Sequence, residues 1–278
     1  MKVYDCFMFF NELDLIELRF EELYSTVDYF VIAESNVTHA GNPKPYIFLD
    51  NWMRYSKFHD KIRHIKVDDM PDSFGGMDRD RYQRQSLSRG LHDLQDNDFV
   101  IVSDLDEIPR AELIEMIKTD TNDYDRYMLN IPQFRHRLNF MKVKESYKYT
   151  NIIVTKGNIF TDPHSERSLT FPWTAKPTNS VILEHGGWHF TWLGNDKEVI
   201  NKLSNFAHTE LNTASARNYI NIEDVLKNKK SFLPNHDEEF EYVIIDDYYP
   251  DAIKNNLDKW SDLIIPDAKK EVTEIYKD

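Results

Sequence analysis

Three carboxylates follow an apolar run near the middle of the chain. Asp104, Asp106 and Glu107 fill three of four successive positions, soon after the run Phe-Val-Ile-Val at residues 99–102. That run is short and β-branched, which predicts a buried strand. Acids at the end of a strand lie where open α/β sheets bind their ligands. Two hard oxygen donors on one side of the chain, Asp104 and Asp106, suit Mg²⁺ or Mn²⁺ bound together with substrate phosphates.

The residues alone leave a second interpretation of this cluster open. Acidic residues are also common in the first turn of a helix, and Pro109 stands where it could open a helix over residues 110–118. The three acids would then be a solvated, capping start of that helix. The rest of the chain has to decide between a capped turn and a ligand site.

The chain before this cluster predicts parallel strands. Residues 3–10 and residues 27–33 are apolar and strand-like, and a stretch with helical spacing lies between them. A strand, a helix and a strand joined by short links form a βαβ unit, whose strands are parallel. Asn11 and Glu12 follow the first strand and Glu34 follows the second, so all three are candidates for contact with the same ligand.

Two other stretches bear on the site. Residues 78–95 predict a helix with Arg81 and Arg84 on a strongly polar face. Such arginines either face solvent beside acids of the same helix or bind a phosphate-bearing ligand. Residues 163–178 contain three prolines and predict a loop.

A strand over residues 180–183 leads into a segment with two glycines, two histidines and two tryptophans. This segment contains Glu184, Trp188, His189 and Trp192. His189 is a candidate third metal ligand, because imidazole binds Mn²⁺ beside carboxylates; a single histidine is more often a hydrogen-bonded structural residue. The tryptophans offer stacking faces for sugars, although tryptophan more commonly packs in a core.

Composition narrows the class of protein. The chain has 278 residues, 41% of them hydrophobic, and no Gly/Ser-rich linker, so we predict a single domain over residues 1–278. A net charge of −14 argues against nucleic acid as the main partner. The single cysteine, Cys6, indicates a reducing compartment. No apolar run is long enough to span a bilayer and no signal peptide is recognisable, so we expect a soluble, cytoplasmic protein.

Several motifs, in this order, resemble glycosyltransferase family 17, the family of the β-1,4-N-acetylglucosaminyltransferase that adds bisecting GlcNAc to N-glycans. The motifs are DCFMFFNELDLIELR (residues 5–19), VIAESNVTHAGNPKP (31–45), RYQR (81–84), SDLDEIP (103–109), GWHF (187–190) and KLSNFAHTE (202–210). They are spread over most of the chain. SDLDEIP within this ordered set is specific, whereas a D-x-D motif alone is weak.

The resemblance implies a GT-A type α/β fold, with a mixed central sheet flanked by helices. Roughly residues 1–120 would bind the nucleotide sugar, and roughly residues 121–278 would form the acceptor half and a C-terminal wrap. It also implies inverting, metal-dependent transfer (Mn²⁺ or Mg²⁺) of GlcNAc from UDP-GlcNAc to a hydroxyl of a glycan or glycoconjugate. Animal members are Golgi type II membrane proteins with a stem, and this sequence shows neither feature. We therefore expect a soluble enzyme that acts on a glycan other than the N-glycan.

The motifs and the resemblance together assign roles as expectations. Asp106 ligates the metal, Asp104 ligates it or contacts the donor ribose, and His189 is the third ligand. Contacts to the nucleoside are expected from Glu34 and from Asn11 or Glu12, and Arg81 and Arg84 are candidates for the diphosphate, one of them rather than both.

Inversion needs a general base that takes the proton of the acceptor hydroxyl. Glu107, Glu184 and Glu210 are unranked candidates, and Trp188 and Trp192 are candidate acceptor platforms.

Two other classes of protein stay open. A non-catalytic carbohydrate- or nucleotide-binding module would be expected to lose the acids, and a metal-dependent phosphoesterase or nucleotidyltransferase would need more His and Asp ligands. The oligomeric state and the acceptor are not indicated by the sequence.

Overall fold

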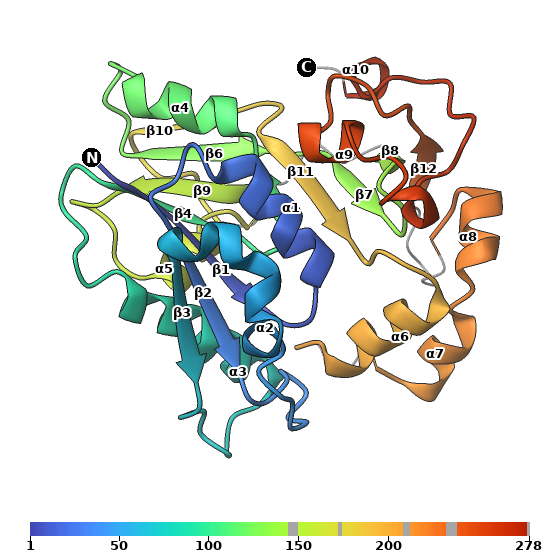
Figure 1. The fold of residues 1–278 in the computed structure, drawn as a ribbon, viewed down its shortest axis with the longest axis horizontal. Coiled ribbons are helices and arrows are strands. Elements are labelled where there is room, and N and C mark those ends of the chain that lie inside the picture. Colours follow the sequence, from blue (N-terminus) through green and yellow to red (C-terminus); the bar gives the residue numbers. More distant parts are fainter. Residues whose placement is uncertain (144–149, 172–173, 208–211, 232–237, 277–278) are drawn as a thin grey trace.

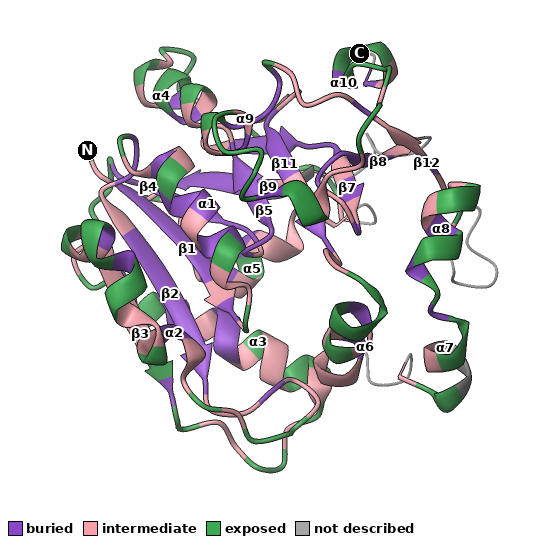
Figure 2. Cartoon of the chain, turned by 45° about the vertical axis from the view of Figure 1, so that its right-hand side comes forward, coloured by how far each residue is buried: buried purple, intermediate pink, exposed green. Residues whose placement is uncertain are grey.

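The chain folds around two β-sheets (Figure 1). The structure is a computed structural model, and it describes residues 1–143, 150–171, 174–207, 212–231 and 238–276. Strands β1, β2 and β4 are buried, whereas helices such as α4 and α6 have exposed outer faces (Figure 2). The prediction of an α/β protein with a mixed sheet flanked by helices is confirmed.

The larger sheet has seven strands in the order β10-β6-β9-β4-β1-β2-β3. Their bounds are β1 (Val3–Phe9), β2 (Tyr29–Ser35), β3 (Ile62–Val67), β4 (Phe99–Val102), β6 (Arg126–Asn130), β9 (Thr150–Lys156) and β10 (Ser180–Leu183). Strand β9 runs antiparallel to both of its neighbours, and the other pairs are parallel. The predicted βαβ unit is confirmed, because α1 (Leu13–Leu23) joins β1 to its parallel neighbour β2.

The smaller sheet has five strands in the order β12-β8-β7-β11-β5. Their bounds are β5 (Glu107–Pro109), β7 (Gln133–Arg135), β8 (Phe140–Val143), β11 (Gly187–Thr191) and β12 (Glu239–Tyr242). Residues 103–106, here called the acid loop, leave β4 of the larger sheet and enter β5 of the smaller one. The acid loop therefore lies at the junction of the two sheets.

Helices cover both faces of the larger sheet. Alternate residues of β1 point to opposite faces: Phe7 packs with α1, whereas Cys6 packs with residues beyond α3. The bounds of the other helices are α2 (Ile47–Asp50), η1 (Trp52–Lys61), α3 (Gly76–Ser86), η2 (Leu87–Gly90), α4 (Ala111–Thr119), α5 (Pro163–Ser168), α6 (Asp196–Asn205), α7 (Ala214–Tyr219), α8 (Ile222–Asn228), α9 (Asp251–Lys254), η4 (Ser261–Leu263) and α10 (Val272–Ile275). In the part of the chain described, no helix is both long and apolar enough to cross a membrane.

Three local predictions were wrong. The helix predicted over residues 110–118 is present as α4 (Ala111–Thr119), but Pro109 does not open it, because Pro109 ends β5 two residues earlier. The helix predicted over residues 78–95 ends at Ser86 and is followed by a 3-10 turn to Gly90, where an added Cβ would meet the Val31 side chain at 2.5 Å. The backbone at Gly90 thus lies too close to β2 to carry a side chain. Residues 163–168 form α5 instead of a loop, because Asp162 caps the amides of residues 164 and 165.

Candidate active site

A glycine brings the two strands beside the acid loop together. In the antiparallel pair of β5 and β11, Gly187 faces Pro109 and His189 faces Glu107. Gly187 has φ +153°, and a Cβ on it would lie 2.0 Å from the carbonyl oxygen of Ile108. Only glycine allows this close approach, which sets the imidazole of His189 beside the carboxylates.

A single buried arginine holds the backbone of the acid loop in place. Arg19 of α1 donates from Nε and Nη2 to both oxygens of Asp5 in β1, at 2.8 and 2.6 Å. The same guanidinium donates to the hydroxyl of Ser103 at 2.8 Å and to the carbonyl oxygens of Asp104 and Glu107 at 2.9 Å each. These charge-assisted bonds hold the loop backbone against the sheet. The side chains of the acid loop are then free to point away from the sheet.

Two arginines bind the carboxylate of Asp104. Arg84 of α3 donates to Oδ1 at 2.7 Å, and Arg167 of α5 donates to Oδ2 at 3.2 Å. Burial opposes the charge of Asp104, but the two guanidinium groups outweigh it and hold the pKa of Asp104 well below its ordinary value. The carboxylate is therefore ionised and carries a cation on each oxygen.

Asp106 faces a lysine and a histidine. Its carboxylate is 10% exposed; Oδ2 accepts from Nζ of Lys202 in α6 at 2.9 Å, and Oδ1 lies 3.6 Å from Nε2 of His189. Burial opposes ionisation, but Lys202 and His189 lower the pKa of Asp106. Burial also lowers the pKa of His189 to about 4, so the ring is neutral at neutral pH. A neutral imidazole is the form that binds metals.

Two amides set the orientation of the His189 ring. The Nδ2 atom of Asn151 lies 3.2 Å from Nδ1 of His189, and Nε2 of Gln133 lies 3.4 Å from it. As drawn, both amides donate to Nδ1, which leaves the ring proton on Nε2, toward Asp106. If the amide of Asn151 turns over and accepts from Nδ1, Nε2 gains a free lone pair and His189 can act as a ligand; the amide of Gln133 is held by Arg135, which donates to its Oε1 at 3.2 Å.

Asp106 and His189 fit as two ligands of one divalent ion. Ligand distances of about 2.0–2.2 Å place neighbouring ligands of an ion about 3 Å apart, near the separation of Oδ1 and Nε2. Asp104 does not join them, since both of its oxygens bind arginines. Within the described part of the chain, no group of three His, Cys, Asp or Glu side chains is placed to hold a metal. The expected three-residue set is therefore not assembled, and the remaining ligands would have to come from a substrate.

Glu107 is buried beside the acid loop. One carboxylate oxygen accepts from Nη2 of Arg167 at 2.8 Å, and the other accepts from the backbone N–H of Asp104 at 2.8 Å. Burial raises the pKa of Glu107 to about 8, although Arg167 works in the opposite direction. Glu107 belongs to β5, so it is not the helix-start acid that the sequence also allowed.

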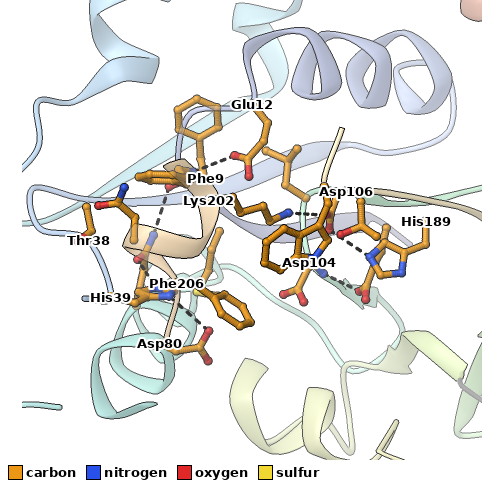
Figure 3. Close-up of a pocket in the computed structure, with 18 of the residues that line it drawn as sticks. Phe9, Glu12, Thr38, His39, Asp80, Asp104, Asp106, His189, Lys202 and Phe206 are labelled. Atoms are coloured by element: carbon orange, nitrogen blue, oxygen red, sulfur yellow. Dashed lines mark hydrogen bonds and ion pairs between the residues drawn. The ribbon is translucent and has the colours of Figure 1, made fainter. Parts of the chain in front are cut away.

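These side chains line a cavity of about 400 Å³ at the carboxyl ends of β1, β2 and β4, here called the first cavity (Figure 3). One end holds Asp104, Asp106, His189 and Lys202, and the other end is formed by Phe9, Thr38, His39, Asp80 and Gln83. Cavities of this volume at the ends of parallel strands are typical small-ligand sites.

Comparison with known proteins identifies the family of the chain. The sequence model of glycosyltransferase family 17 matches residues 1–248. The chain belongs to glycosyltransferase family 17. Among its relatives are proteins named "Beta-1,4-mannosyl-glycoprotein 4-beta-N-acetylglucosaminyltransferase" from Homo sapiens and Rattus norvegicus, each 32% identical over 116 residues, and from Mus musculus, 31% identical over the same length. The match covers 39% of this chain and 22% of each relative.

This family 17 chain gathers some of the expected site residues in the first cavity. Glu12, Asp104, Asp106, Glu107, His189 and Trp192 all line it. Arg84 reaches it through its bond to Asp104. Asn11 lies just outside, in a neighbouring cavity.

Other expected residues lie elsewhere. Glu34 is buried under Lys44, His64 and the start of α2, and Arg81 is exposed on α3. The carboxylate of Glu184 binds Asn130 and Tyr276. The indole of Trp188 is 1% exposed and donates to the carbonyl oxygen of Tyr248, so its ring cannot present a face to an acceptor. Glu210 lies outside the described residues.

The family 17 site also uses residues that the sequence did not single out. Arg167 was overlooked because its helix was predicted as a loop, although Asp162 before Pro163 is a helix-start signal. Lys202 opens the motif KLSNFAHTE, but nothing in the sequence places it on Asp106, 96 positions away. Gln133 and Asn151 lie on β7 and β9, and only the packing of the two sheets brings them to His189.

Proposed function

We propose that this chain is an inverting N-acetylglucosaminyltransferase that moves GlcNAc from UDP-GlcNAc to a hydroxyl of a glycan or glycoconjugate. The observation that carries the proposal is the first cavity of this family 17 chain. The acid loop lies at one end of the cavity, and the other end has room for a nucleoside. A GT-A type arrangement is part of the same proposal, and the order of the seven-stranded sheet, with one antiparallel strand, supports it.

The nucleoside would bind at the end of the first cavity remote from the acid loop. Phe9 is buried and closes the wall there, and His39 offers hydrogen-bonding groups. Gln83 fixes the wall, since it contacts Nε2 of His39 at 3.0 Å and donates to the carbonyl oxygen of Ala33 at 2.9 Å. An apolar wall with fixed polar groups is typical of sites that recognise a planar base.

The diphosphate would lie toward the acid loop. Arg167 and Lys202 line the cavity there and can neutralise phosphate oxygens. Asp106 and His189 would hold the divalent ion, Mn²⁺ or Mg²⁺, whose charge serves to neutralise the departing diphosphate. Asp104, both of whose oxygens bind arginines, would keep Arg84 and Arg167 in place instead of ligating the ion.

In the transfer, the acceptor oxygen forms a bond to the anomeric carbon while the bond from that carbon to the diphosphate breaks. The proton of the acceptor hydroxyl passes to a base, and UDP leaves with the bonding electrons. Glu107 is our proposed base, because it lines the first cavity whereas Glu184 does not. In its ionised form each oxygen of Glu107 accepts one bond and keeps a lone pair for the acceptor hydroxyl, and the raised pKa of Glu107 makes that form a stronger base.

Release of UDP from UDP-GlcNAc tests the proposed function. Wild-type protein with Mn²⁺ should release UDP, and Asp106→Ala should reduce the rate by about 100-fold or more, as loss of one charge-stabilising group does in other enzymes. Asp69→Ala is the matched control, because Asp69 is also paired with a cation, Arg89, but lies outside the first cavity. If wild-type protein releases no nucleotide from any UDP-, GDP- or CMP-sugar, with or without metal, the proposal is wrong.

A further inference from the structure

A second cavity of about 480 Å³ adjoins the first. It lies between the start of α1, residues 190–195 after β11, α6 and the segment around η4. Glu12, Trp192 and Lys202 line both cavities. We propose that the second cavity binds the acceptor, and that the part of the acceptor held there is an uncharged sugar. This inference rests on the proposed function.

The shared residues place the second cavity next to the reacting centre. Lys202 lines the second cavity, yet its Nζ reaches Asp106 at 2.9 Å in the first. A sugar in the second cavity and a donor in the first would thus meet around Lys202 and Trp192. A transferase needs this arrangement, because an acceptor oxygen has to reach the anomeric carbon.

The walls of the second cavity offer the groups that bind sugars. Trp192 supplies ring surface, and Asn201 and Arg137 supply hydrogen-bonding groups in fixed planes. Aromatic faces take the apolar side of a sugar ring, while amides and guanidinium groups bind its hydroxyls.

The segment that carries Trp192 is held in a rare backbone conformation. Trp192 has φ +53°, in the left-handed region that a bulky residue seldom adopts. Its carbonyl oxygen lies 3.0 Å from Nδ1 of His136, and the next turn is fixed where Nη1 of Arg137 donates to the carbonyl oxygen of Gly194 at 2.7 Å. The surroundings therefore hold the backbone of Trp192 in this conformation at the wall of the second cavity.

The charges of the lining favour an uncharged ligand. The lining of the second cavity contains four carboxylates (Glu12, Asp14, Glu198 and Asp262) and three cations (Arg54, Arg137 and Lys202). Arg54 is already paired with Asp14, and Lys202 with Asp106. Only Arg137 is left to meet a ligand anion, and Asp262 and Glu198 already act on its charge. A uronic acid would therefore face a wall of net negative charge.

Saturation-transfer NMR with simple glycosides tests the site. The probes are methyl β-glucoside, methyl β-mannoside and methyl β-glucuronide, of which the first and third differ at C6 alone. We expect the two neutral glycosides to receive saturation from wild-type protein and the glucuronide to receive several-fold less. Asn201→Trp should abolish the signal, because Asn201 lines the second cavity but not the first. Lys197→Trp, on an exposed position of α6 outside both cavities, should keep it.

Three results would overturn the inference: no saturation of either neutral glycoside, an equal or stronger signal from the glucuronide, or an unchanged signal in Asn201→Trp. UDP release measured on the same samples separates this inference from the proposed function. A wild-type protein that releases UDP but binds no neutral glycoside refutes the acceptor site alone.

Discussion

Replacing the buried pair of Arg19 and Asp5 separates the stability of the fold from the positioning of the acid loop. Both side chains are 0% exposed, and each is the ion-pair partner of the other. Removing one member leaves an uncompensated buried charge, which costs about 3–5 kcal/mol. Asp5→Leu and Arg19→Met should each lose about that much free energy of unfolding, a large part of the 5–15 kcal/mol typical of a domain.

The double variant Asp5→Leu/Arg19→Met should behave differently. Apolar replacement of a whole buried pair is often close to neutral. What remains lost are the bonds from Arg19 to the carbonyl oxygens of the acid loop, worth about 1–3 kcal/mol. The double variant should thus be more stable than either single variant. Its UDP release should nevertheless fall by about 10–100-fold, because a loop displaced by about 1 Å misplaces Asp106.

Urea unfolding followed by tryptophan fluorescence measures the stabilities, and UDP release measures the site. Arg63 and Asp93 are the control pair: they are 17% and 31% exposed, and the double replacement Asp93→Leu/Arg63→Met should change stability by about 1 kcal/mol or less and leave UDP release unchanged. The reasoning fails if either single replacement at the buried pair costs under about 1 kcal/mol. It also fails if the double variant regains full activity, since Arg19 would then act only as the counter-charge of Asp5.

Two further predictions concern other charged groups. Lys202→Met frees an oxygen of Asp106, so the affinity for Mn²⁺ should rise by about tenfold, as measured by electron paramagnetic resonance. Unchanged or weaker binding of Mn²⁺ would contradict a competition between Lys202 and the ion. Burial opposes the charge of Glu238, but Arg135 and Lys142 lower its pKa to about 2. The stability it adds is present above about pH 4.5 and is lost as the pH falls toward 2, at most about 3 kcal/mol. Glu238→Gln should flatten unfolding free energy against pH in that window, and a curve parallel to wild type would refute this.

The parts of the fold that could be predicted from sequence are those fixed by local patterns. The β1-α1-β2 unit and β4 follow from apolar spacing, which survives in any tertiary context. The acid loop and Glu107 after it were candidates because their carboxylates follow a buried strand, and the resemblance to family 17 then favoured a ligand site over a capped turn. The strand β5 could not be predicted, because Glu107–Pro109 is extended only through its pairing with β11, some eighty residues later.

The site was predicted less completely, for a physical reason. Its carboxylates are local in sequence, whereas the groups that set their charge and orientation are not. Gln133 and Asn151 orient His189 across the joined sheets, and Lys202 reaches Asp106 from α6, which Figure 1 shows beyond the arrowhead of β11. Contacts of this kind have no periodicity or spacing that a single sequence could reveal.

The charge balance around the acid loop bears on how a donor can bind. Arg84, Arg167 and Lys202 come from three different helices, and each has a carboxylate of Asp104 or Asp106 as its partner. A diphosphate that takes one of these cations leaves a buried carboxylate beside phosphate, which is a costly arrangement.

A divalent ion arriving with the diphosphate removes that cost, because it replaces the cation at Asp106. We therefore expect UDP to bind at least about tenfold more weakly in EDTA than with Mn²⁺ when measured by calorimetry. Asp69→Ala should show the same difference, since its carboxylate lies outside both cavities. Equal affinity for UDP with and without Mn²⁺ would mean that Arg84, Arg167 and Lys202 bind the diphosphate directly.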